Sequence, residues 1–249
     1  MSYLWDLILY KPLINALAFL ISIVPGGNVG LAVIILTILV KLALFPIAQK
    51  ALRNQTAMNM MAPELEKIKQ SGVSKEEQAR LTFELYKKHK TNPFSGCLIQ
   101  IPMILVFIAL FHAFREGVNF DSSLMYSFVH IPENISMSFL YFFDMSQESW
   151  ILGAIAGISQ YVQVKFMPKP KTRELKPGEE MSFADNLGKS MNMNMQYFLP
   201  VMIFFFASNF SGAVALYWIV SNIFTIVQQM YVNKTEEREL DAEVRVLKS

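Results

Sequence analysis

Apolar residues occur along the chain in long blocks that are separated by charged segments. A helix needs about 20 apolar residues, at about 1.5 Å each, to cross the hydrocarbon core of a membrane. Suitable blocks are residues 29–49, 94–116 and 149–166, and two more lie within 195–232, joined by a tight turn. The pattern therefore predicts an all-α polytopic membrane protein with five transmembrane helices.

The first 28 residues predict a further helix of a different kind. Pro12 can begin a helix but not continue one, so the regular part is expected at 12–24, about 20 Å long. Its less apolar positions recur at helical spacing: Lys11, Asn15, Ala18 and Ser22. We therefore expect residues 1–28 to form an N-terminal interfacial amphipathic helix. A true first span, or an uncleaved signal anchor, is the alternative.

Basic residues are distributed unevenly among the segments between the spans. Nine Lys or Arg residues lie in 50–90 and six in 165–189, whereas 117–148 contains none. Segments rich in Lys and Arg face the cytoplasm. We expect the segments 50–93 and 167–194 and the tail 233–249 in the cytoplasm, and the N-terminal helix and the loop 117–148 outside it.

The segment 50–93 has the pattern of a cytoplasmic helical hairpin. Ser71-Gly72-Val73 separates two helical patterns, and Ser74 with Glu77 forms a capping box for the second helix. Pro63 is expected to kink or restart the first helix. The apolar positions that follow helical spacing include Met58, Met61, Leu65, Phe83 and Tyr86. They predict either a solvated connector or a docking arm with an adaptable, methionine-rich surface.

Lys41 is the one charged residue near the middle of a predicted span. An unpaired charge at that depth costs at least about 2.5–3.5 kcal/mol. No Asp or Glu lies in the apolar parts of the five spans to compensate it. One interpretation is that Lys41 snorkels to the cytoplasmic headgroups. We favour a lysine that points into a hydrated groove.

Several uncharged polar residues could line that groove with Lys41. Taken singly, each could simply form an interhelical hydrogen bond. Beside an uncompensated lysine, a shared polar cavity explains them better. The residues are Thr37, Gln100, Gln160, Gln163, Trp218, Asn222, Thr225 and Gln228.

Composition narrows the function classes. Hydrophobic residues make up 53% of the chain and charged residues only 17%, and the net charge of +2 does not suggest direct nucleic-acid binding. A single cysteine, Cys97, excludes an intramolecular disulfide and a multi-cysteine zinc site. The three histidines are scattered, and neither a catalytic constellation nor a phosphate-binding glycine loop occurs. We predict no catalytic residue, no metal, no cofactor and no enzymatic activity.

Four segments together resemble the YidC-type membrane protein insertases, the oxidase-assembly and Albino group. They are 30–46 (GLAVIILTILVKLALFP), 86–97 (YKKHKTNPFSGC), 100–102 (QIP) and 211–229 (SGAVALYWIVSNIFTIVQQ). Their order and spacing carry the resemblance, which extends from residue 10 to about 232. The chain is similar to the short bacterial form, without a large extracytoplasmic domain.

The resemblance implies a fold and a function. It implies a monomer in the bacterial plasma membrane, with a cytoplasmic C-terminus and a hydrophilic groove that is closed on the outside. Such a protein inserts and helps to fold nascent membrane proteins without nucleotide hydrolysis, and it contacts membrane lipids. The ribosome, the signal-recognition pathway and the Sec translocon are further partners that the resemblance implies.

The resemblance also assigns roles to residues. Lys41 occupies the place of the groove arginine, Thr37 and Trp218 match groove positions, and either Gln160 or Gln163 matches a groove glutamine. Lysine keeps the charge of arginine but lacks its planar fork. The second span is about three residues shorter after Cys97 than in the family pattern. A small-solute transporter and a structural subunit of a larger complex are the rival interpretations.

Overall fold

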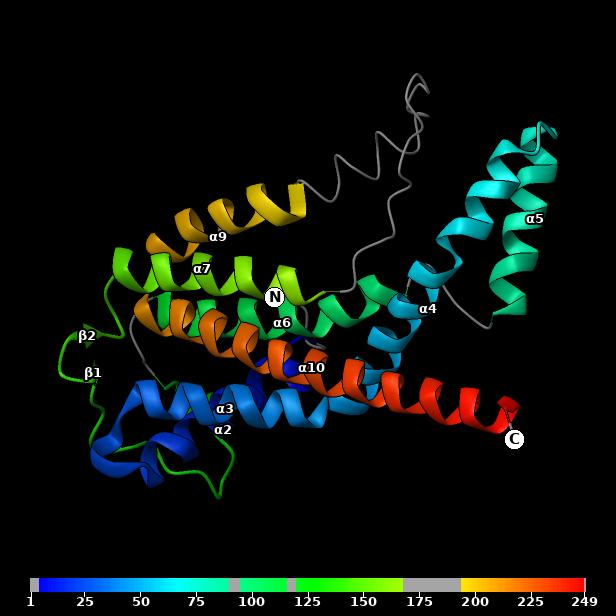
Figure 1. The fold of residues 1–249 in the computed structure, drawn as a ribbon. Coiled ribbons are helices and arrows are strands. Elements are labelled where there is room, and N and C mark those ends of the chain that lie inside the picture. The colour runs from blue at the N-terminus through cyan, green and yellow to red at the C-terminus, as the bar shows by residue number, and fades with distance from the viewer. Residues whose placement is uncertain (1–4, 90–94, 116–119, 168–193, 249) are drawn as a thin grey trace.

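The computed structural model describes residues 5–89, 95–115, 120–167 and 194–248. Figure 1 shows most of its helices side by side along a common direction, with a pair of helices projecting at one end. The described segments are mostly helical, which confirms the predicted helical class. Within these described ranges, two helices can cross a membrane by length and composition, Asp6–Ile23 and Gly212–Lys234. The bent pair Val29–Ala43 and Phe45–Asn54 makes a third if it is one span. The number of five spans stays a prediction.

The helices that form the bundle have these bounds: α2 Lys11–Ile23, α3 Val29–Ala43, α6 Ser95–Arg115, α7 Trp150–Phe166, α9 Leu199–Ser208 and α10 Gly212–Lys248. The projecting pair consists of α4 Phe45–Gln70 and α5 Lys75–Lys88. Short helical turns are η1 Asp6–Tyr10, η2 Pro25–Gly27, η3 Ser122–Leu124 and η4 Asn194–Phe198. Two short antiparallel strands, β1 Ser138–Phe139 and β2 Phe143–Asp144, lie at the opposite end of the bundle.

The N-terminal helix is longer than the sequence predicts. The π-helical turn η1 continues directly into α2, so the helix contains 18 residues, Asp6–Ile23. The backbone N–H of Lys11 donates to Asp6 O, five residues back, and this wider turn carries the helix past Pro12. The expectation that the helix begins at Pro12 was wrong. Its length now suffices for a span, although its place in the membrane stays a prediction.

The buried face of α2 holds an asparagine. Asn15 is only 2% exposed, and its amide nitrogen donates to Lys11 O at 2.7 Å and to Leu124 O at 2.8 Å. Its side-chain oxygen accepts from the N–H of Tyr126 at 2.7 Å. The exposed large side chains of this helix are instead apolar: Leu7, Ile8, Phe19 and Ile23. Asn15 therefore holds the loop after η3 against α2, and apolar groups face outward.

Replacing Asn15 with leucine should loosen that loop. The substitution leaves the carbonyl of Leu124 and the N–H of Tyr126 without partners, and each unpaired buried group costs about 1–3 kcal/mol. We expect faster amide hydrogen exchange at Tyr126. Ser22→Ala is the control, because the Ser22 hydroxyl is exposed and donates only to Phe19 O within its own helix. Equal exchange rates in both variants would contradict the role of Asn15.

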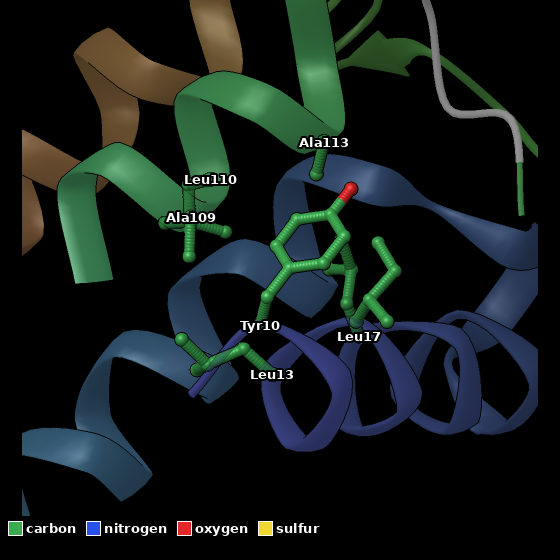
Figure 2. A pocket seen from close by; sticks show the side chains of 7 residues that line it. Tyr10, Leu13, Leu17, Ala109, Leu110 and Ala113 are labelled. Carbon is green, nitrogen blue, oxygen red and sulfur yellow. The ribbon is translucent and has the colours of Figure 1, made fainter. Parts of the chain in front are cut away.

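A narrow apolar gap remains between α2 and α6. Figure 2 shows the ring of Tyr10 between the two helices, with Leu13 and Leu17 on the α2 side and Leu110 and Ala113 on the α6 side. The gap is too narrow for a water molecule. It is a packing contact between the N-terminal helix and α6, and it offers no room for a ligand.

The predicted span 29–49 is divided in the structure. The helix α3 ends at Ala43, and α4 begins at Phe45 after a bend of 61°. Pro46, the second residue of α4, has no N–H to donate to Leu42 O, and the residue before a proline disfavours helical geometry. The first predicted span is therefore not one straight helix, and Lys41 lies in the last turn of α3 rather than in the middle of a helix.

The segment in which the sequence predicts a helical hairpin contains the helices α4 and α5. The helix α4 continues through Pro63 without restarting, and Ser71–Ser74 connect it to α5. The Ser74 hydroxyl accepts from the N–H of Glu77 at 3.2 Å, as the capping box predicts. The last helix, α10, continues to Lys248 and so includes residues 233–248 of the segment that was expected as a separate tail.

The helices α7 and α9 approach each other at two glycines. A methyl group added to Gly153 would overlap Ser208, and one added to Gly157 would lie 3.0 Å from the carbonyl oxygen of Pro200. The absence of side chains at these positions lets the backbones pack closely. This contact positions α7, which carries Ser159, Gln160 and Gln163, three of the polar residues described next.

Candidate functional site

Lys41 reaches across from α3 to α10. Its ammonium nitrogen donates to Thr225 Oγ1 at 2.8 Å, and the side chain is only 8% exposed. The Thr225 hydroxyl in turn donates to Ser221 O at 2.8 Å. Lys41 thus points into the bundle. The snorkelling interpretation requires the side chain to extend along α3 toward water instead, which it does not. Its place in the last turn of α3 is favourable for a cation, because the carbonyl groups at a helix C-terminus carry partial negative charge.

A second group of polar contacts joins α7 to α10. Trp218 Nε1 donates to Gln160 Oε1 at 3.0 Å, and Gln160 Nε2 donates to Gln163 Oε1 at 2.9 Å. Asn222 Nδ2 donates to Ser159 Oγ at 3.0 Å. Both glutamines are buried, and Gln160 is the one that contacts Trp218 directly. The sequence could not distinguish the two glutamines.

The polar side chains of α10 occupy one face of that helix. Trp218, Asn222 and Thr225 are spaced by four and three residues, the spacing of neighbours on a helix face. Through them, α10 connects α7 on one side with α3 on the other. We call these residues the polar network: Lys41, Ser159, Gln160, Gln163, Trp218, Asn222 and Thr225.

Two further polar residues of α10, Gln228 and Gln229, lie near the edge of the network. Gln228 donates to Phe45 O at 3.4 Å, at the break between α3 and α4. Gln229 is buried and donates to Asn233 Oδ1 at 2.8 Å, while its side-chain oxygen has no partner among the described residues. Sequence reasoning missed Gln229 and Ser159, although Gln229 lies one turn beyond Thr225 on the same face.

The remaining predicted groove residues are placed differently. Thr37 is buried one turn before Lys41, and its hydroxyl donates to Val33 O within α3 at 2.7 Å. Thr37 is thus one helical turn from Lys41, but it makes no hydrogen bond to the described residues of the network. The side chain of Gln100 lies outside the described residues.

The predicted docking residues of the hairpin are also distributed unevenly. Phe83 is 66% exposed, whereas Leu65 and Tyr86 are partly buried. Met61 is only 1% exposed, so it belongs to the packing of α4 and not to an open surface. The side chain of Met58 lies outside the described residues. Of the described members of the set, Phe83 is the best placed to meet a partner.

Aromatic rings cover the network on the side of the α9–α10 turn. The ring of Phe107 meets Trp218 edge-on with centroids 5.3 Å apart, and Phe210 meets Phe107 at 6.1 Å and Phe111 at 5.1 Å. These contacts favour edge-to-face geometry, which packs rings densely. Phe107 thereby connects Trp218 of the network to Phe210, which lies in the turn between α9 and α10.

The charge of Lys41 is not matched by an acid in the surrounding helices. Neither α3 nor α7 nor α9 contains Asp or Glu, and in α10 none occurs before residue 236. Within the described residues, no group of His, Cys, Asp and Glu could hold a metal ion. The fold and the site together define a helical membrane protein with a buried, uncompensated cation in a network of neutral hydrogen-bonding groups.

Comparison with known proteins places the chain in a family. The family model described as "60Kd inner membrane protein" matches residues 19–239. The membrane protein insertase YidC of Geobacter sp. (strain M21) is 32% identical over 241 residues, which cover 95% of this chain and 39% of that protein. The membrane protein insertase MisCA of Bacillus subtilis is 30% identical over 241 residues, which cover 92% of this chain and 79% of that protein. The chain belongs to the 60Kd inner membrane protein family.

These comparisons confirm the resemblance to YidC-type insertases that the motifs indicate. The YidC protein of Citrifermentans bemidjiense is a further relative, 31% identical over 238 residues, or 94% of this chain and 38% of that protein. The chain spans about two fifths of the length of the YidC relatives. The relatives are named for an insertase and not for an enzyme, in agreement with the predicted absence of enzymatic activity.

Proposed function

We propose that this protein inserts nascent membrane proteins into the bacterial inner membrane and helps them to fold, without nucleotide hydrolysis. The observation that carries the proposal is the buried Lys41, whose only described hydrogen-bond acceptor is the neutral hydroxyl of Thr225. A lysine ammonium has three donors, and the nearby helices provide no carboxylate. An acidic or polar tail of a substrate would supply the missing acceptors.

The polar network is the proposed groove. Amides, an indole N–H and hydroxyl groups of α7 and α10 make contacts along the same face of α10 as Thr225, the partner of Lys41. Such groups can replace water around a polar tail. The aromatic cluster of Phe107, Phe111 and Phe210 would close this groove toward the outside. We propose that a tail remains there, part-way across, until the apolar segment of the substrate has entered lipid.

Lipid partition would provide the driving force. Burial of apolar surface stabilises by about 25 cal/mol per Å², and a segment of about 20 apolar residues therefore releases enough free energy to leave the groove. The helical stretch Gln196–Ser208, in which η4 continues into α9, would reach only about 20 Å along its axis. Short helices of this kind thin the bilayer locally and so shorten the distance that a tail must cross.

The orientation and the partners belong to the same proposal. We infer that the α4–α5 hairpin, with Phe83 exposed on α5, lies in the cytoplasm and receives substrates. The C-terminus would lie on the same side, because Figure 1 places the end of α10 at the end of the bundle from which the hairpin projects. Nascent membrane proteins and membrane lipids are the proposed partners of a monomer, with the ribosome, the signal-recognition pathway and the Sec translocon upstream.

Reconstitution of the purified protein in lipid vesicles tests this function. We expect the protein alone to insert a single-spanning substrate, measured as protease protection of its translocated tail, with no added nucleotide. Vesicles without the protein are the control. A transporter of small solutes, or a structural subunit that needs a partner, would leave the substrate exposed to protease at the level of the control.

A further inference from the structure

The hairpin formed by β1 and β2 ends in three exposed apolar residues. Leu140, Tyr141 and Phe142, which we call the apolar tip, connect Phe139 to Phe143. The side chain of Tyr141 is 97% exposed and that of Phe142 86%, while Leu140 is exposed as well. Figure 1 places the two strands at the end of the bundle opposite the α4–α5 hairpin. The fold thus presents apolar groups where a protein surface in water is ordinarily polar.

The base of this hairpin is fixed to the ends of two bundle helices. The N–H of Val29, the first residue of α3, donates to Ser136 O at 3.0 Å, and Asn28 Nδ2 donates to Ser138 O at 2.7 Å. The N–H of Ala213 in α10 donates to Met145 O at 3.1 Å. The hairpin is therefore held at the level where α3 and α10 begin.

The tip adopts a backbone conformation that its residues disfavour. Leu140 has φ 51° and Tyr141 has φ 62°, and they are the only non-glycine residues with positive φ in the described part of the chain. A side chain in this region crowds the following carbonyl group, and turns with two consecutive positive φ angles usually contain Asn-Gly. Bulky apolar residues therefore occupy the tip although the turn disfavours them, and their exposure shows that packing against the described residues does not explain them.

We propose that the apolar tip inserts into the headgroup layer of the adjacent leaflet and anchors this end of the bundle to it. The tip and its strands, apart from Asp144 at the end of β2, carry no charge, and Tyr with other aromatic residues is typical of membrane interfaces. Trp150, the first residue of α7, is exposed only six residues beyond Asp144, and Ile151 and Ile155 continue the exposed apolar side of α7. Both the tip and the first turn of α7 therefore carry exposed apolar side chains.

The length of the hairpin limits the tip to that layer. A chain of three residues extends at most about 10 Å from its base. The headgroup region on one side of a membrane is about 5–8 Å thick. A tip fixed at the ends of α3 and α10 consequently remains within reach of the headgroups, and a lipid interface accounts for its exposure without a protein partner.

A fluorescent label measures whether the tip enters lipid. In a Cys97→Ser background, Tyr141→Cys and the exposed loop position Glu133→Cys each receive the same polarity-sensitive dye. The proteins are reconstituted in phosphatidylcholine vesicles that contain a lipid with a headgroup-proximal nitroxide. We expect the label at 141 to be quenched several-fold by the nitroxide lipid and shielded from iodide, and the label at 133 to show the reverse. A label at 141 as open to iodide as that at 133 would overturn the proposal.

A second variant separates anchoring from folding. Leu140→Asn combined with Tyr141→Gly gives the turn its preferred residues and removes two apolar side chains. The dye is attached at Phe142→Cys in two proteins, one with Leu140 and Tyr141 and one with the double substitution. We expect nitroxide quenching in the first protein and its loss in the second, although the second remains folded and monodisperse. Unchanged quenching, or shielding that occurs only in native membranes with other proteins, contradicts a lipid anchor. Neither result depends on insertase activity, so the two proposals can fail separately.

Discussion

Lys41→Glu should abolish insertion of substrates with acidic tails, and Lys41→Arg should retain it. The ammonium group of Lys41 lies among neutral groups, so the sign of the charge at this position decides which tails the network attracts. A hydrogen bond to a charged group contributes about 1.5–3 kcal/mol, which corresponds to roughly 10- to 100-fold in rate. The measurement is the initial rate of protease protection in vesicles, with substrates whose tails differ only in the number of Asp residues.

Lys41→Met separates a role in insertion from a role in folding. Replacing a buried charge with an apolar side chain of similar length is often neutral or stabilising. We expect Lys41→Met to melt no lower than the unmodified protein in detergent and yet to insert acidic tails about 10-fold or more slowly. Lys234→Ala is the matched control, because it removes the same charge from an exposed position on α10. If Lys41→Met inserts substrate at the unmodified rate, Lys41 has no part in the groove.

The choice of lysine has its own consequence. Arginine offers five donors in a planar fork, whereas lysine offers three donors on a flexible stem. The carboxylate of a substrate could therefore be held by two parallel bonds in Lys41→Arg but only by a point charge in this protein. We expect Lys41→Arg to retain full selectivity for acidic tails, and a slower release of substrate would identify tighter capture.

The sequence predicted the composition of the polar network better than its geometry. Lys41, Trp218, Asn222 and Thr225 could be recognised because polar groups in apolar helices need partners. Gln160 and Gln163 are three residues apart on one face of α7, so only the position of α10 decides which of them meets Trp218. Such pairings depend on the placement of helices that are distant in sequence, which periodicity does not contain.

Local backbone chemistry explains the differences in the fold. The break after Ala43 follows from Pro46, a signal present in the sequence, but apolar composition alone made 29–49 look continuous. The π-turn before Pro12 lengthened the N-terminal helix against the usual effect of proline. The positive φ angles of Leu140 and Tyr141 had no sequence signal, because neither residue type favours them.

Gly153→Leu should lower the stability of the bundle more than a substitution on the exposed face of α7. A Cβ at this position would lie 2.8 Å from the backbone nitrogen of Ser208 and 2.9 Å from its Cα, besides overlapping its hydroxyl. Backbone atoms cannot rotate away as a side chain can, so α7 and α9 must separate. Overpacking of this kind costs about 1–3 kcal/mol, which lowers the melting temperature by several degrees in a chain of this size.

Two further variants distinguish backbone contact from contact with the hydroxyl alone. Ser208→Ala removes the overlapping hydroxyl. Added to Gly153→Ala, it should restore only part of the stability that Gly153→Ala alone loses, because the backbone of Ser208 still lies close. Ile158→Leu, on the exposed face of α7, should leave the melting temperature nearly unchanged. Complete rescue by Ser208→Ala would mean that the helices can adjust and that the hydroxyl was the only obstacle.

The same substitution should also disturb the polar network from a distance. Gln160 is seven residues, about two turns, beyond Gly153 on α7, and it accepts from Trp218 of α10 at 3.0 Å. Because hydrogen bonds weaken steeply with misalignment, a shift of α7 away from α9 changes this contact. We therefore expect altered Trp218 fluorescence in Gly153→Leu, relative to Ile158→Leu, in proteins in which Trp5 and Trp150 are replaced by phenylalanine. Identical spectra would show that α7 holds its place against α10 independently of α9.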